Sequence, residues 1–112
     1  MSINVIVALT TCPDEAVAQR ISGILVSERL AGCINRVPGV RSTYIWDGRL
    51  QDEAEILLIM KTTTDRVDAL ERRLRELHPY ELPEFVVTPP LGGNERYLDW
   101  IRRQVGFEGD IQ

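Results

Sequence analysis

The segment with the most chemical potential is His78-Pro79-Tyr80-Glu81-Leu82-Pro83-Glu84. It holds the only histidine of the chain together with two carboxylates, Glu81 and Glu84. A neutral imidazole suits Cu(II), Ni(II) and Zn(II), and carboxylate oxygens can complete such a site. The two prolines of the segment fix their own φ angles and push the residues before them toward extended backbone. The pattern therefore predicts a rigid loop that carries a candidate metal site at His78, Glu81 and Glu84.

The alternative is that His78 only shapes the turn. An imidazole at the end of a helix interacts favourably with the helix dipole and can hydrogen-bond the turn that follows. The residues of this segment leave both interpretations of His78 open.

The two thiols, Cys12 and Cys33, lie at opposite ends of the first predicted helix. At a rise of 1.5 Å per residue those ends are roughly 25 Å apart. An intrachain disulfide is therefore not expected, because it needs Cα atoms within about 7 Å. Cys33 lies in an apolar stretch and is predicted to be a small core residue. Cys12 is predicted to lie beside a helix N-terminus, whose dipole lowers the thiol pKa, and is the candidate reactive thiol.

Lys61 stands directly before three threonines that begin a predicted helix. A lysine beside free helix amides can bind an anion. Together with Tyr80, Tyr44 and Trp46, it is predicted to line a pocket between subunits. An ion pair between Lys61 and Glu84 is the alternative.

Composition limits the classes of function. The chain has 112 residues, 44% hydrophobic and 27% charged, which is typical of a single globular domain spanning 1–112. A net charge of −4 argues against nucleic-acid binding, which needs clustered positive charge. No apolar stretch approaches the roughly 18 residues of a membrane span, and the N-terminus lacks a signal-peptide pattern. We therefore expect a cytoplasmic protein with no membrane partner, and the single histidine argues against an enzyme.

Hydrophobic periodicity predicts an α+β fold. Strands are predicted at Ile3–Leu9, Cys33–Val37 continuing over Val40–Trp46, Arg49–Lys61 and Phe85–Val87. Helices are predicted over 15–31, from 62–64 to Leu77, and from Asn94 onward. This order predicts a ferredoxin-like βαββαβ domain with an additional C-terminal helix, and with both crossover helices on one face of the sheet.

Helix boundaries follow from capping signals. Thr11 or Cys12 is predicted to cap the first helix, and Gly32 to end it. One of the threonines 62–64 is predicted to cap the second helix, which ends before Pro79. Asn94 is predicted to cap the third.

A long hairpin is predicted around Asp47-Gly48, a strong two-residue turn signal. Each arm runs about ten residues, which is longer than an ordinary core strand. A protruding hairpin with exposed Tyr44 and Trp46 would offer open edges, and the strands are apolar on both alternations. Both features predict a homo-oligomer.

Six segments carry a resemblance to a known family. They are Thr10-Thr11-Cys12-Pro13-Asp14, Leu30-Ala31-Gly32-Cys33-Ile34-Asn35, Tyr44-Ile45-Trp46-Asp47-Gly48, Lys61-Thr62, the 78–84 segment and Tyr97-Leu98-Asp99-Trp100-Ile101. Together and in this order they resemble the CutA divalent-ion tolerance family over essentially the whole chain. The resemblance implies a PII-like homotrimer, a link to tolerance of copper and other divalent cations, and copper binding. Some members carry a cysteine near the end of the first strand, where this chain has Thr10.

Three functions remain open at this point. The first is a non-enzymatic, trimeric protein that binds copper or another divalent cation and has no organic cofactor. The second is a PII-like regulatory module that binds a small anionic ligand in clefts between subunits. The third is a rigid trimeric scaffold.

Overall fold

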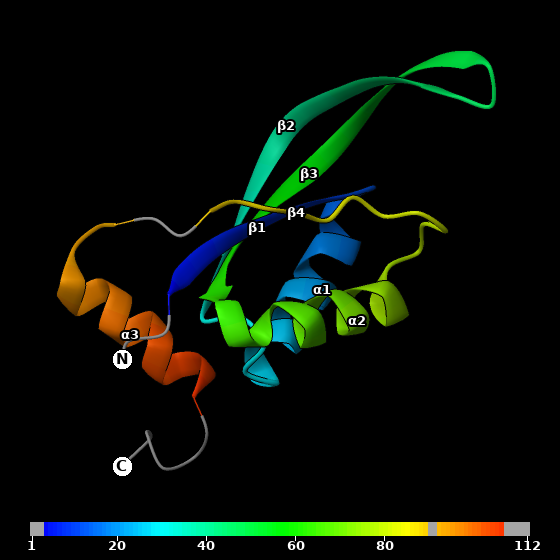
Figure 1. The fold of residues 1–112 in the computed structure, drawn as a ribbon. Helices are drawn as coiled ribbons and strands as arrows, with labels where there is room; N and C mark the ends of the chain where they lie inside the picture. Colours follow the sequence, from blue (N-terminus) through cyan, green and yellow to red (C-terminus); the bar gives the residue numbers. More distant parts are fainter. Residues whose placement is uncertain (1–3, 90–91, 107–112) are drawn as a thin grey trace.

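The computed structural model describes residues 4–89 and 92–106. Its elements are β1 (Val5–Cys12), α1 (Glu15–Ser27), β2 (Cys33–Trp46), β3 (Arg49–Thr63), the short 3-10 helix η1 (Thr64–Arg66), α2 (Val67–Leu77), β4 (Val86–Val87) and α3 (Glu95–Val105) (Figure 1). The predicted α+β class and element order are confirmed. Ile3, the predicted first residue of β1, lies outside the described residues.

The four strands form one antiparallel sheet in the order β2-β3-β1-β4. β1 pairs with β3 from Val5↔Thr63 to Cys12↔Ile56, so β1 extends beyond its predicted end at Leu9. β4 is short and pairs with β1 only at Ala8 and Leu9. The two long central strands therefore carry the core.

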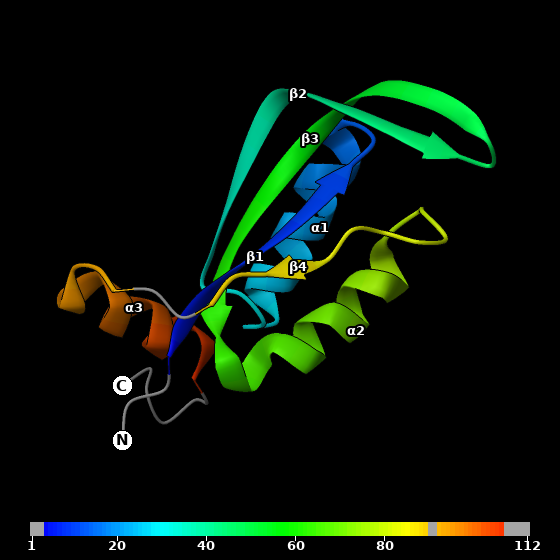
Figure 2. The same ribbon diagram turned by 45° about the horizontal axis from the view of Figure 1, so that its top comes forward.

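Alternate residues of the central strands face α1 and α2, because successive side chains of a strand point to opposite faces. Burial follows this alternation, and both helices lie on the same side of the sheet (Figures 1 and 2). The buried cluster comprises Ile6, Ala8, Cys12, Leu58 and Met60 from the strands and Ala18, Ile21, Leu25, Leu70 and Leu74 from the helices. The predicted one-sided packing of the crossover helices is thus observed.

The other face of the sheet is only half-buried at Val7, Leu9, Leu57 and Ile59. α3 packs at one end of the sheet, against β3 and β1. Its contact with the turn before β2 is close, because a Cβ at Gly32 would meet Ile101 Cδ1 at 3.2 Å. Apolar strand residues thus remain partly exposed on this face.

β2 and β3 form a hairpin that extends past the rest of the fold (Figure 2). The register shifts between Val37 and Val40, where Gly39 has a positive φ of 80°. At the tip, Asp47 (φ 55°) and Gly48 (φ 77°) make the predicted two-residue turn. Ile45 and Leu50 beside it are 71% and 74% exposed.

Two helix ends differ from prediction. α1 ends at Ser27 rather than near Gly32, because Arg29 takes the left-handed conformation with φ 61°. Its N-cap is Asp14, whose side chain accepts a hydrogen bond from the Val17 amide at 2.9 Å. Thr11 and Cys12 cannot cap α1 because both lie in β1.

The start of α2 is also later than predicted. β3 continues through Thr63, and η1 separates it from α2, which begins at Val67. α2 ends at Leu77 before the extended His78, as Pro79 predicted. The Asn94 cap of α3 is confirmed by hydrogen bonds from the amides of Arg96 and Tyr97.

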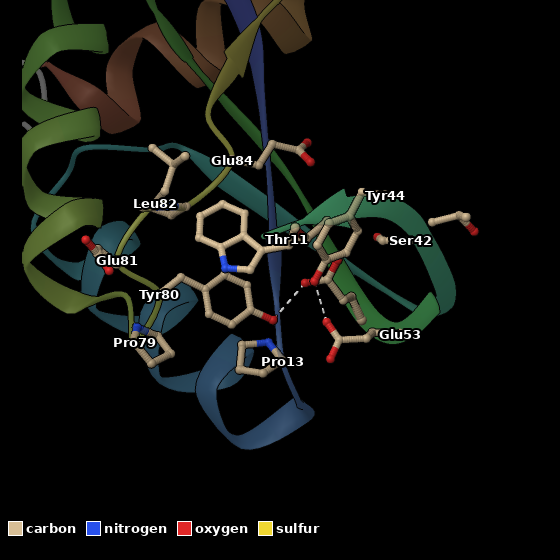
Figure 3. A pocket seen from close by; sticks show the side chains of 14 residues that line it. Thr11, Pro13, Ser42, Tyr44, Glu53, Pro79, Tyr80, Glu81, Leu82 and Glu84 are labelled. Carbon is tan, nitrogen blue, oxygen red and sulfur yellow. Dashed lines mark hydrogen bonds between the residues drawn. The ribbon is translucent and has the colours of Figure 1, made fainter. Parts of the chain in front are cut away.

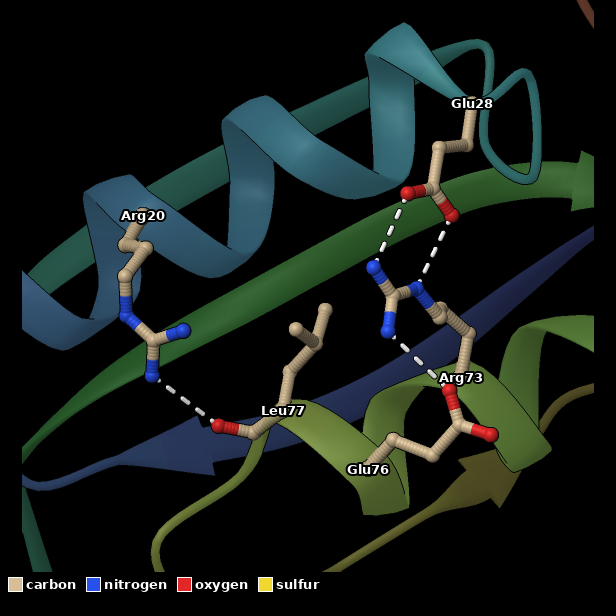
Figure 4. Close-up of polar contacts among 5 residues, drawn as sticks. All are labelled: Arg20, Glu28, Arg73, Glu76 and Leu77. Carbon is tan, nitrogen blue, oxygen red and sulfur yellow. Dashed lines mark hydrogen bonds and ion pairs between the residues drawn. The ribbon is translucent and has the colours of Figure 1, made fainter.

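Two arginines join α1 to α2 (Figure 4). Arg73 donates to both carboxylate oxygens of Glu28, at 2.9 and 3.0 Å, and to Glu76 at 3.0 Å. Arg20 donates to the Leu77 carbonyl oxygen at 3.0 Å. This last contact fixes the end of α2, from which the 78–84 loop departs.

Two further arginines hold the C-terminal end of α3. Arg29 donates to the Gln104 carbonyl oxygen at 2.9 Å, and Arg66 donates to the Val105 carbonyl oxygen at 2.8 Å. Both carbonyls lie in the last turn of α3, where helix hydrogen bonds are missing and a cation is favourable.

Replacement of Arg66 by alanine should lower the free energy of unfolding by about 1–2 kcal/mol, because a charge-assisted hydrogen bond is lost. Urea denaturation measures this change. Arg72→Ala, on the exposed side of α2, is the control and should change stability by less than about 0.5 kcal/mol. Equal stability of both variants would contradict a role for Arg66 in holding α3.

Candidate functional site

An open groove with a volume of about 1010 Å³ lies between the hairpin and the 78–84 loop (Figure 3). β1 and the turn after it contribute Thr11 and Pro13. The hairpin and the loop contribute Ser42, Thr43, Tyr44, Trp46, Glu53, Glu55, Pro79, Tyr80, Glu81, Leu82, Pro83 and Glu84. The groove therefore depends on segments that are far apart in the sequence.

The lining of the groove has one sign of charge. Its carboxylates are Glu53, Glu55, Glu81 and Glu84, and among the residues that the structure describes no lysine, arginine or histidine lines the groove. Such a surface attracts cations and repels anions.

Two of these carboxylates are held by tyrosine hydroxyls. Glu53 and Glu55 alternate along β3 and so share one face of the strand. The Tyr44 hydroxyl donates to Glu53, and the Tyr80 hydroxyl donates to Glu55 Oε2 at 2.8 Å (Figure 3). The Tyr80 contact links the loop to β3. Glu55 is only 6% exposed.

The surroundings of both phenols raise their pKa values further above neutral. Burial, and then the hydrogen bond to Glu55, raise the pKa of Tyr80 well above its ordinary value. The hydrogen bond to Glu53 raises the pKa of Tyr44. Both hydroxyls therefore act as hydrogen-bond donors at neutral pH.

His78 is a buried structural residue in this conformation. Its Nε2 lies 2.7 Å from the Thr11 carbonyl oxygen, which can only accept, so Nε2 carries the hydrogen. Its Nδ1 accepts a hydrogen bond from the Tyr80 amide at 3.1 Å. The side chain is 7% exposed and packs against the Tyr80 ring, with 4.7 Å between ring centroids. No ring nitrogen keeps a free lone pair for a metal, and the turn-shaping interpretation describes the observed contacts.

The predicted ligands His78, Glu81 and Glu84 are not brought together. The carboxylates of Glu81 and Glu84 are exposed and point away from one another (Figure 3). Over residues 4–89 and 92–106, no three His, Cys, Asp or Glu side chains are grouped as a metal site would require. Within one chain these three residues therefore do not form a metal site, because the ring nitrogens of His78 are already bonded, and a metal site at them stays a prediction that needs groups from a second subunit.

The pocket between subunits that was predicted at Lys61, Tyr80, Trp46 and Tyr44 stays a prediction, but within one chain these residues do not all line one groove. The three aromatic residues line the groove and Lys61 does not. Lys61 lies against Tyr97 of α3, with its Nζ 3.3 Å from the hydroxyl and 5.5 Å from the ring centroid. The alternative ion pair with Glu84 is also not formed, because α3 holds the ammonium elsewhere.

Cys12 does not have the predicted reactive environment. It is fully buried in β1, and burial, followed by the charges of Glu55 and Asp14, raises its pKa to about 11. The expected lowering is wrong because β1 continues through Cys12 and α1 begins only at Glu15. Cys33 is half-buried.

Glu53 and Glu55 were missed by sequence reasoning. The signal was available, since two glutamates one residue apart in a strand share a face. The sequence did not predict the burial of Glu55, because Glu55 is buried by a tertiary contact with Tyr80.

Within the described ranges, no helix has the length and apolar character needed to cross a membrane.

Replacement of His78 by alanine should lower the free energy of unfolding of the metal-free protein by about 2–3 kcal/mol. Two hydrogen bonds and a buried ring are lost, and the Thr11 carbonyl oxygen loses its side-chain donor. Thermal and urea denaturation measure the change. Glu81→Ala, on the same loop but exposed, should have an effect below about 0.5 kcal/mol. An unchanged free energy of unfolding in His78→Ala would contradict the structural role and would leave His78 as a candidate metal ligand.

Known proteins match this chain over most of its sequence and share its fold. The model of the family described as "CutA1 divalent ion tolerance protein" matches residues 6–104. A divalent-cation tolerance protein CutA of Thermus thermophilus is 48% identical over 100 residues, covering 89% of this chain and 97% of that protein. "Protein CutA 1, chloroplastic" of Oryza sativa is 42% identical over 97 residues, covering 87% of this chain and 55% of the rice protein.

A solved structure of CutA1 from Oryza sativa matches with a TM-score of 0.91 at 38% identity, covering 96% of this chain and 98% of that chain. With the family model matching nearly the whole chain, this chain belongs to the CutA1 divalent ion tolerance protein family.

Proposed function

We propose that this protein binds a divalent cation, with copper among the cations it accepts, as a PII-like homotrimer that performs no catalytic step. The observation that carries the proposal is the groove, which presents four carboxylates and no basic lining residue. Relatives named for divalent-cation tolerance support the same class of ligand.

The geometry favours a site completed by a second chain. Glu81 and Glu84 remain candidate ligands because they are exposed at the groove, but they point apart (Figure 3). Each therefore needs additional donor atoms from outside its own loop. A neighbouring subunit can provide them.

Apolar exposure supports the assembly. Ile45 and Leu50, which pair across the hairpin tip, are 71% and 74% exposed, and one face of the sheet is only half-buried. Contiguous apolar surface of this kind marks a protein–protein contact.

The donor atoms bear on the choice of metal. The groove offers oxygen donors, and Cu(II) has the highest affinity of the divalent first-row series for a given site. His78 can add a nitrogen only by giving up its hydrogen bond from the Tyr80 amide. His78 is thus a conditional ligand, available after a rearrangement of the loop.

The two alternatives are less well supported. A small anion is disfavoured in a groove that has no basic lining residue, and Lys61 is engaged with Tyr97. A rigid scaffold would explain the apolar hairpin tip but gives the carboxylates no role. A cytoplasmic location stays a prediction, because the rice relative is named chloroplastic.

Calorimetric titration of the chelator-treated protein with Cu(II) tests the metal site. We expect saturable binding that the double variant Glu81→Gln/Glu84→Gln weakens at least about tenfold, equivalent to about 1.4 kcal/mol. Asp68→Asn/Glu71→Gln removes the same charge from α2 and should leave binding unchanged. Equal binding by the Glu81/Glu84 variant and the wild type would remove these ligands from the proposal.

Light scattering tests the assembly. We expect three times the mass of one chain, and a lower mass for Ile45→Ser/Leu50→Ser, because the apolar hairpin tip is lost. Val26→Ser, on the exposed side of α1, is the matched control and should keep the assembly. A monomeric wild-type protein at micromolar concentration would contradict the trimer.

A further inference from the structure

The inner groove, formed by Glu53, Glu55, Tyr44, Trp46 and Tyr80, is part of a groove that is large enough for an organic ligand. A metal ion needs only donor atoms at about 2.0–2.6 Å. The whole groove measures about 1010 Å³, and small-molecule sites occupy roughly 300–1,000 Å³. Its volume is therefore much larger than a bare ion requires.

Glu55 lacks a positive partner. The residue is 6% exposed. Within the described part of the chain, its carboxylate accepts one hydrogen bond, from the Tyr80 hydroxyl. None of the salt bridges among those residues includes it. The Glu55 carboxylate thus has a hydrogen-bond donor but no ion pair among the described residues, and a cationic ligand in the groove can supply one.

The charge of Glu55 is also felt by its neighbours. After burial, it is the next cause of the raised pKa of Cys12, and it contributes to the raised pKa of Tyr80. Glu55 is therefore close enough to Cys12 and Tyr80 for its charge to act on both.

Three aromatic side chains surround the carboxylates. Tyr44, Trp46 and Tyr80 line the groove, and Tyr44 and Trp46 are 38% and 53% exposed. Aromatic faces attract ammonium groups through their quadrupole and cover methylene groups by apolar contact. A ligand that is both cationic and partly apolar fits this lining better than an inorganic ion.

The spacing of the carboxylates defines the ligand further. Glu53 and Glu55 are two residues apart on β3, which is roughly 7 Å along a strand. Each has one oxygen held by a tyrosine hydroxyl, which limits its movement. Two carboxylates held on one face of the strand can each pair with one ammonium group of a short alkyl diamine.

We propose that the inner groove binds a linear alkyl diamine or polyamine. One ammonium group pairs with Glu55 and a second with Glu53, while the methylene chain contacts the aromatic residues. The site goes beyond the proposed metal function, since it uses neither Glu81 nor Glu84 and needs no metal.

Calorimetric titration of the chelator-treated protein with 1,4-diaminobutane at neutral pH and low salt tests the proposal. We expect saturable binding, and none with 1,4-butanediol, the neutral probe of similar length. Glu55→Gln should weaken binding at least tenfold, because an amide can still accept from Tyr80 but carries no charge. Trp46→Leu should weaken it less, by about threefold, through loss of one aromatic face.

The controls separate this site from the metal site. Glu81→Gln/Glu84→Gln should lower the affinity for the diamine less than Glu55→Gln does, because it removes charge from the outer groove only, while its Cu(II) binding falls. Glu53→Gln provides a second variant if Glu55→Gln does not fold, and it should also weaken binding.

The results that overturn the proposal are definite. Equal diamine binding by wild type, Glu55→Gln and Glu53→Gln would overturn it, as would equal binding of the diol or no diamine binding at millimolar concentration. Diamine binding without Cu(II) binding would overturn the metal function alone, and the reverse result would overturn only the inner-groove site.

Discussion

The pairing of β1 with β3 is the constraint on which the rest of the structure depends. It runs without interruption from Val5↔Thr63 to Cys12↔Ile56. Because side chains alternate along paired strands, this register sends one set of apolar residues toward α1 and α2 and the other to the half-buried face. A slip of one residue would exchange the two sets and expose the core.

The same pairing positions the groove. β1 continues through Thr11. The Thr11 carbonyl oxygen accepts a hydrogen bond from the imidazole of His78, which lies at the end of α2. The other ring nitrogen of His78 holds the Tyr80 amide, and the Tyr80 hydroxyl reaches Glu55 on β3. Through this chain of three contacts, one strand end fixes the loop and closes one side of the groove.

The negative charge of the groove depends on the contacts that the charged side chains of the fold make. Two basic side chains on elements that border the sheet and the loop contact other groups. Arg20 donates to the end of α2, and Lys61 lies against Tyr97. The groove keeps its carboxylates without a basic side chain among its lining residues. Cations are therefore the ligands that this surface can stabilise, and tyrosine hydroxyls fix the orientation of Glu53 and Glu55.

Local signals in the sequence determined the fold class and most element types, because they depend on periodicity and turn chemistry. Asp47-Gly48 fixed the hairpin turn, Asn94 capped α3, and Pro79 ended α2. Helix boundaries at Cys12 and Gly32 were decided by tertiary structure. Strand pairing extended β1 through Cys12, and α1 ends early at Arg29, which takes the left-handed conformation and donates to the last turn of α3.

The site depended still more on tertiary contacts. The sequence singled out His78 and Cys12 by residue type, but burial and hydrogen bonding occupy the imidazole and raise the thiol pKa to about 11. In the sequence Glu55 is an ordinary strand glutamate, and only the fold shows that the 78–84 loop covers it. Residue type is a local property, whereas the availability of a lone pair or a charge is set by neighbours that only the fold brings together.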